Sequence, residues 1–208
     1  MKKVILILAV IMIFVFTNTL CSQKVGEPGF RPESDLAQTF INSHKKSKFI
    51  IYPTIIRTID TTTWSELLSR EFAENLKKDK KLSVSLSKTT QDPGKLKGDG
   101  QFAIFENDME ILGKNIDQKE EKTDYNMILE IVFAPKRDEN LNVFGIHVFI
   151  LNNEGKNAFS FLLNSHHELF VNAKLFAKNP YEKEVEQLNL KCITVALEAF
   201  KQQVDGSN

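Results

Sequence analysis

The sequence has few residues that could cross-link it covalently. Its 208 residues include two cysteines, Cys21 and Cys192. If Cys21 is removed or modified, no intrachain disulfide is expected, even in an oxidising compartment. Cys192 lies at helical spacing among apolar residues, which predicts a small buried side chain rather than a reactive thiol.

The chain also lacks an excess of charge of one sign, with 27 basic and 27 acidic residues. Proteins that bind nucleic acid usually present a basic face, so this balance predicts no nucleic-acid partner. Hydrophobic residues make up 42% of the chain and charged residues 26%, which indicates an ordinary globular protein.

Motifs for nucleophilic or phosphate chemistry are missing. No Gly-x-Ser-x-Gly elbow is present, and Gly98-Asp99-Gly100 lacks the longer glycine pattern of a phosphate loop. Acidic residues between Asp117 and Asp124 lie among lysines, which favours a solvated loop over a paired acid and base. We therefore predict no catalytic residues, no cofactor and no enzymatic activity.

The histidines offer one cluster that resembles metal ligands, His166-His167-Glu168. Placed on a strand, His166 and Glu168 would share a face while His167 points away. A zinc site needs three or four ligands, so we predict no metal site.

The N-terminus is typical of an exported protein. Lys2 and Lys3 precede an apolar run of 13 residues, Val4–Phe16, and the chain then turns polar. A membrane span needs about 20 apolar residues, so residues 1–21 are predicted to be a signal peptide.

The end of this signal leaves two alternatives open. Cys21 stands where a lipoprotein carries its lipid, although bulky Leu20 precedes it, so Cys21 is a lipidation candidate on an outer membrane lipoprotein. Ordinary cleavage after Cys21, with Thr19 and Cys21 as the small residues, would instead release a free periplasmic protein.

After the signal, residues 22–47 are predicted to be a tether with a short helix at Asp35–His44, and residues 48–208 an α/β domain. Phe49–Arg57 indicates a central strand, with Pro53 marking a bend or an edge near its middle. Thr63-Trp64-Ser65-Glu66 fits a capping box, so a helix is expected to begin there. Its predicted apolar stripe is Trp64, Leu67, Leu68, Phe72 and Leu76.

The rest of the chain continues this alternation. The expected elements are a strand at Leu82–Leu86, a loop at Thr89–Gly100, a helix at Phe102–Ile116, strands at Tyr125–Phe133, Val143–Asn152 and Ala158–Phe170, and a long helix at Pro180–Val204. The Ala158–Phe170 run is either one strand or a strand broken inside. The predicted fold is of the α/β or α+β class. It has a single mixed sheet of about five strands, in the order β-α-β-α-β-β-β-α, with helices packed on it.

Phenylalanine is unusually frequent, with 16 residues against three tyrosines and one tryptophan. Most lie at core-like positions, but a group in the predicted hairpin forms a candidate interaction surface, with burial against the helices as the alternative. The group is Phe144, Phe149, Phe159 and Phe161.

This order of elements resembles the α/β domain of bacterial envelope lipoproteins, including the penicillin-binding-protein activator lipoproteins, CsgG and the N-terminal domain of TolB. The likeness is carried by Phe49–Pro53, by Thr63–Leu68 through Phe72–Leu76, and by Asp124–Leu129. It implies a non-catalytic role in binding envelope proteins, although the pore insertions of CsgG have no counterpart here.

Together these features predict a non-catalytic exported protein of the bacterial envelope that binds a protein partner through its sheet edge, hairpin or terminal helix. The alternative is a soluble periplasmic carrier of a small apolar ligand, which phenylalanine-rich walls would suit. An enzyme of unknown type is the third reading.

Overall fold

The structure is a computed structural model and describes residues 29–30, 34–116, 123–134, 140–178 and 181–205. The predicted signal peptide, residues 1–21, and the lipidation candidate Cys21 lie outside the described residues. Among the helices of the described part, none is long and apolar enough to cross a membrane.

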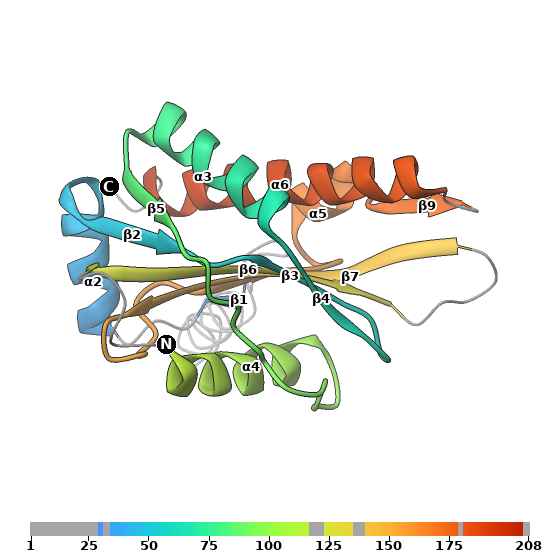
Figure 1. The fold of residues 1–208 in the computed structure, drawn as a ribbon, viewed down its shortest axis with the longest axis horizontal. Coiled ribbons are helices and arrows are strands. Elements are labelled where there is room, and N and C mark those ends of the chain that lie inside the picture. The colour runs from blue at the N-terminus through green and yellow to red at the C-terminus, as the bar shows by residue number, and fades with distance from the viewer. Residues whose placement is uncertain (1–28, 31–33, 117–122, 135–139, 179–180, 206–208) are drawn as a thin grey trace, which may run out of the picture.

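One mixed sheet of nine strands forms the centre of the fold (Figure 1). The strands are β1 (Gly29–Phe30), β2 (Lys48–Ile51), β3 (Thr54–Arg57), β4 (Thr62–Ser65), β5 (Ser83–Leu86), β6 (Tyr125–Phe133), β7 (Asn140–Asn152), β8 (Phe161–Leu163) and β9 (Phe176–Lys178). The main path runs β1-β8-β7-β6-β2-β5; β3 pairs with β6 and β4, and β9 with β7. Strands β2, β3, β5 and β6 pair in parallel, and the other pairs are antiparallel.

Helices cover both faces of this sheet, which confirms the predicted mixed α/β class. They are α2 (Ser34–Ser43), α3 (Glu66–Lys80), α4 (Gln101–Asn115), α5 (Glu168–Ala173) and α6 (Glu182–Asp205), with a short 3-10 turn at His44–Lys46. In Figure 1, α3, α5 and α6 lie above the sheet and α4 lies alone below it.

Strand β6 shows how the sheet separates two cores, because successive side chains point to opposite faces. Met127 and Leu129 join the core under α3 and α6, whereas Ile128 joins the core under α4. Glu130 occupies the next position on the α4 side and is completely buried there.

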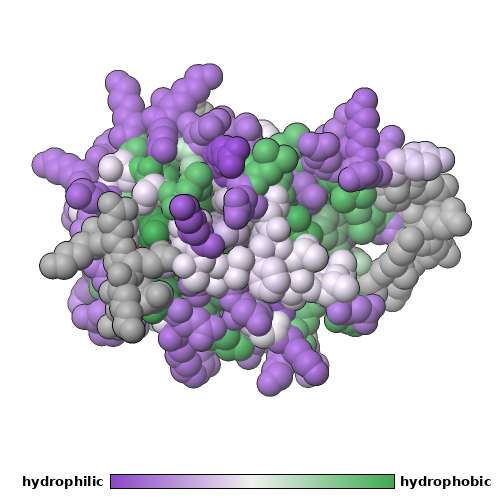
Figure 2. Space-filling view, viewed as in Figure 1, coloured by the Kyte–Doolittle hydropathy of each residue, from purple (hydrophilic) through white to green (hydrophobic). Residues whose placement is uncertain are grey.

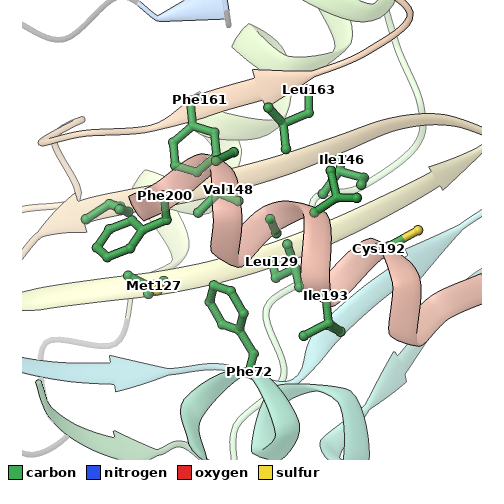
Figure 3. Close-up of a cluster of buried hydrophobic side chains, with 14 of the residues drawn as sticks. Phe72, Met127, Leu129, Ile146, Val148, Phe161, Leu163, Cys192, Ile193 and Phe200 are labelled. Atoms are coloured by element: carbon green, nitrogen blue, oxygen red, sulfur yellow. The ribbon is translucent and has the colours of Figure 1, made fainter. Parts of the chain in front are cut away.

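The larger core lies between the sheet and helices α3 and α6. Figure 3 shows Phe72 of α3 with Ile193 and Phe200 of α6 meeting Met127 and Leu129 of the sheet. Phe40 of α2 closes one end with its ring stacked on Phe159, the two ring centres 4.7 Å apart. Phenylalanine rings therefore fill this core.

The predicted number of strands, about five, was too low, because several short strands had no clear signal in the sequence. Strand β1 has two residues, and β9, which was missed, has three. The long strand expected at Phe49–Arg57 is divided at Tyr52-Pro53 into β2 and β3, both paired with β6, so Pro53 marks a break in the strand and not an edge.

The capping box predicted at Thr63–Glu66 is wrong. Thr63 and Trp64 belong to β4, and the helix begins at Glu66 with Ser65 as its N-cap, whose Oγ accepts from the Leu68 amide at 3.2 Å. Of the predicted stripe, Leu68 is buried, whereas Trp64 and Leu67 are exposed.

The strand predicted at Ala158–Phe170 is also too long. Only Phe161–Leu163 is a strand, and Glu168–Ala173 forms α5. The remaining predicted helices and strands are found, with ends shifted by one to three residues or unchanged, as at Tyr125–Phe133.

Candidate functional site: a buried charge cluster beneath helix α4

Arg57 is the centre of the site and comes from the end of β3. Its side chain lies on the same face as Ile55, toward α4, because the two are separated by one residue on a strand. Only 1% of the side chain is exposed. A guanidinium buried this deeply requires negative or polar partners, since an unpaired buried charge is strongly destabilising.

Two carboxylates supply that charge. Arg57 Nη1 lies 2.6 Å from Asp108 Oδ2 of α4 and 2.7 Å from Glu130 Oε1 of β6. Arg57 Nη2 donates to the carbonyl of Gly94 at 3.1 Å. A single arginine thus joins α4 and the preceding loop to the middle of the sheet.

His147 of β7 completes the cluster. It lies directly opposite Glu130 in the antiparallel ladder, and its Nδ1 is 2.7 Å from Glu130 Oε2. Its ring meets Phe105 of α4 edge-on, with ring centres 5.4 Å apart. His147 Nε2 is buried without a hydrogen-bond partner and lies over Gly145, where a Cβ would approach it to 3.1 Å.

The two carboxylates have opposite pKa shifts. Burial, reinforced by the charge of Glu130, raises the pKa of Asp108 to about 7, against the opposing effect of Arg57. Burial alone would raise the pKa of Glu130 too, but the hydrogen bond and charge of His147, together with Arg57, outweigh it and lower that pKa. When Asp108 holds a proton, the charges of Arg57 and Glu130 cancel.

A metal ion is the first ligand to consider for this donor set. One donor atom each from Asp108, Glu130 and His147 lies within 4.8 Å of the others, and such oxygen and nitrogen donors suit zinc. However, the Arg57 guanidinium already bridges both carboxylates, and His147 Nδ1 already bonds Glu130. The geometry is therefore that of an ion-pair cluster.

Helix α4 seals the cluster from solvent, so its titratable groups do not line a cleft. All four side chains are at most 1% exposed. The helix is also fixed at its far end, where a Cβ on Gly113 would lie 2.4 Å from the carbonyl oxygen of Gly155 in the turn after β7. The cluster and this close backbone approach together hold α4 against the sheet.

The predicted phenylalanine surface is not formed. Phe149, Phe159 and Phe161 have no exposed area, and Phe144 is half-buried. Phe159 and Phe161 pack in the core under α6, and Phe149 stacks on Phe105 of α4 with ring centres 5.1 Å apart. Burial against the helices, the alternative, is what the structure shows.

The His166-His167-Glu168 cluster lies at the start of α5 and not on a strand. His167 is the N-cap of that helix, and its Nδ1 accepts from the Leu169 amide at 3.2 Å. Burial lowers the pKa of His167, opposed by the charge of Glu168. His167 is therefore a helix-capping residue, and His166 lies in the turn before it, where its amide donates to the Asn164 side chain.

Cys192 is buried as predicted, and burial raises the pKa of its thiol to about 12.

The four cluster residues were missed as a group by the sequence analysis. The available signal was Glu130, a carboxylate in the middle of an apolar strand, which requires a buried cation.

The depressions of the described surface include two that adjoin helices. One, of about 350 Å³, lies between α3 and α6 beside Leu76, Leu190 and Leu197. The other, of about 440 Å³, lies between α2 and the β7 end of the sheet, beside Leu36 and Tyr125. Neither is lined by a residue of the charge cluster.

Comparison with protein-family models found no match. Comparisons with curated proteins and with solved structures found none either.

Proposed function

We propose that this chain is a non-catalytic exported protein of the bacterial envelope that acts by binding a protein partner. The observation that carries the proposal is the open edge of the sheet at β5, which pairs with β2 and with no other described strand. An unpaired strand offers a row of backbone donors and acceptors to another chain.

The buried charge cluster supports binding over catalysis. General acid and base groups must come within hydrogen-bond reach of a substrate. Asp108, Glu130 and His147 are enclosed beneath α4 and bonded to Arg57 or to one another. Their contacts stabilise the fold, and we therefore assign the binding function to the surface of the protein.

Export rests on the N-terminal sequence, with Cys21 as the site of a lipid anchor. The test is the intact mass of the mature protein from a membrane fraction, compared with a Cys21→Ala variant. A diacyl or triacyl mass increment that is lost in the variant supports anchoring, whereas an unmodified chain beginning at Ser22 overturns it and leaves a free periplasmic protein.

Partner binding is tested by crosslinking in cells of the source organism. A photoreactive amino acid replaces Leu86 at the β5 edge, and Val171 on α5, which is also exposed, serves as the matched control position. A discrete crosslinked protein at Leu86 that is absent at Val171 supports the proposal. No product at either position, or identical products at both, contradicts binding at this edge.

A further inference from the structure

Strand β5 has the geometry of an acceptor for an added strand. The Ser87 amide donates to the Ile51 carbonyl of β2 at 2.9 Å. Backbone groups alternate sides along a strand, so Ser85 also faces β2 while Val84 and Leu86 direct theirs away from it. Leu86 is 41% exposed, and Figure 2 shows apolar atoms at the surface where β5 runs.

The other strands that pair with one described strand are less suitable for the addition of a further strand. Strand β1 has two residues and β9 has three, which is short for pairing with a further chain. Strand β4 is crossed by the loop that follows β5, because the Trp64 indole Nε1 donates to the Gln91 carbonyl at 2.8 Å.

Lysines surround the β5 edge. Lys81 and Lys88 lie two residues before and two residues after the strand, and Lys48 is the register partner of Ser83 on β2. All three side chains are exposed. No acidic residue occurs between Lys80 and Gln91, and the nearby Asp124 carboxylate is bonded to the Lys48 amide on the β6 side.

This charge argues against a second copy of the chain as the occupant. Two copies pairing antiparallel through their outward residues, with Val84 of one opposite Leu86 of the other, would bring Lys81 of one copy diagonally beside Lys88 of the other. Like charges on neighbouring positions of paired strands repel each other, and edge lysines are a common defence against self-pairing.

We infer that the free edge of β5 pairs with an extended segment of a partner protein that carries acidic side chains. The inference rests on the proposed partner-binding function and names the chemistry of the partner. Backbone hydrogen bonds to Val84 and Leu86 supply pairing, and Lys48, Lys81 and Lys88 select for negative charge.

The probe is a fluorescent peptide of about eight residues that alternates valine and glutamate, with a lysine-for-glutamate peptide as the comparison. Binding to the full chain, kept in solution with nonionic detergent, is followed by anisotropy. The glutamate peptide is expected to bind at least about tenfold more tightly than the lysine peptide.

Two variants separate backbone pairing from charge. Leu86→Pro removes an outward amide, a change that an edge strand tolerates, and Leu86→Ala keeps the amide as its control. The double variant Lys48→Glu/Lys88→Glu reverses the charge, with Lys183→Glu on α6 as its control. The proline and double variants are expected to bind the glutamate peptide about tenfold more weakly, and both controls within about threefold of the parent chain.

Equal binding of both peptides, no binding of either, or unchanged binding by Leu86→Pro would overturn the inference. Self-association of the parent chain that Leu86→Pro abolishes would overturn it as well and make a second copy the occupant. If Leu86 forms crosslinks in cells but the acidic peptide does not bind, the proposed partner binding at β5 stands. Only the inference that the partner segment is acidic is then overturned.

Discussion

His147 and Glu130 face each other directly across the β6–β7 ladder, with the imidazole Nδ1 2.7 Å from the carboxylate Oε2. The other carboxylate oxygen lies 2.7 Å from Arg57 Nη1. Glu130 is thus held between a guanidinium and an imidazole in the middle of a buried strand. Its contacts join β6 to β3 and β7, and Arg57 extends the cluster to Asp108 of α4.

Glu130→Gln is expected to destabilise the protein by about 3 kcal/mol at pH 7, because it leaves the buried Arg57 with less negative charge. Urea unfolding followed by circular dichroism measures the change. Glu110→Gln is the matched control, since Glu110 is exposed and pairs with Lys114 on the surface. Equal unfolding midpoints for the two variants would contradict a structural role for the cluster.

Asp108 is expected to make stability fall as pH rises from about 4 to about 7. Its pKa is raised from 3.8 to about 7 in the folded protein, so the folded state retains a proton that the unfolded state has lost. The resulting stabilisation is fully present below the unfolded pKa and is lost as pH rises through about 7.

Asp108→Asn removes this dependence because the amide remains neutral. The variant should match the parent chain near pH 4 and exceed its free energy of unfolding by about 4 kcal/mol near pH 8. Urea titrations at both pH values make the comparison. A variant that is equally destabilised at both would show that Asp108 acts as a charged partner throughout.

Glu130 contributes the opposite dependence at acidic pH. Its lowered pKa gives stability that is present above the ordinary value of 4.5 and is lost as pH falls through the folded pKa. The same titrations extended below pH 4.5 should therefore show a loss of stability in the parent chain that is reduced in Glu130→Gln.

Gly113→Ala is expected to destabilise the protein by about 2 kcal/mol, although alanine normally favours a helix. The added Cβ would meet the Gly155 carbonyl oxygen at 2.4 Å, so α4 must shift away from the turn. Lys114→Ala, at the next and exposed position of α4, is the control. A more stable Gly113→Ala would mean that the two backbones are not in close contact.

Cys192 should resist alkylation in the folded protein, because its thiol is buried and its pKa is raised to about 12. In a Cys21→Ala background, labelling by iodoacetamide is expected only as denaturant unfolds the chain. Rapid labelling of the native protein, followed by mass spectrometry, would place Cys192 in an accessible site instead.

Local patterns predicted the buried elements well and the long-range contacts poorly. Strand Tyr125–Phe133 was predicted to the residue, because nine consecutive residues are buried on both faces. Thr63 and Ser65 are both good N-cap residues, and the choice between them depends on the pairing of β4 with β3, which no capping rule contains.

The charge cluster could not be assembled from the sequence. Arg57 and Asp108 are separated by 51 positions and Arg57 and Glu130 by 73. The pairing of β3 with β6 brings Glu130 to Arg57, and the packing of α4 on the sheet brings Asp108 there. His166 was assigned to a strand because apolar residues precede it. The Asn164 side chain, which accepts from the His166 amide at 2.9 Å, instead ends the strand in a turn.

The pairing of β1 with β8 places the first described strand of the chain at one edge of the sheet. Gly29 pairs with Leu162 at the opposite end of the strand order from β5. A lipid on Cys21 would leave eight positions before Gly29, a reach of at most about 28 Å. The β1 edge would then stay close to the bilayer, and β5, about 24 Å away across the sheet, would be the edge free to turn toward proteins of the periplasm.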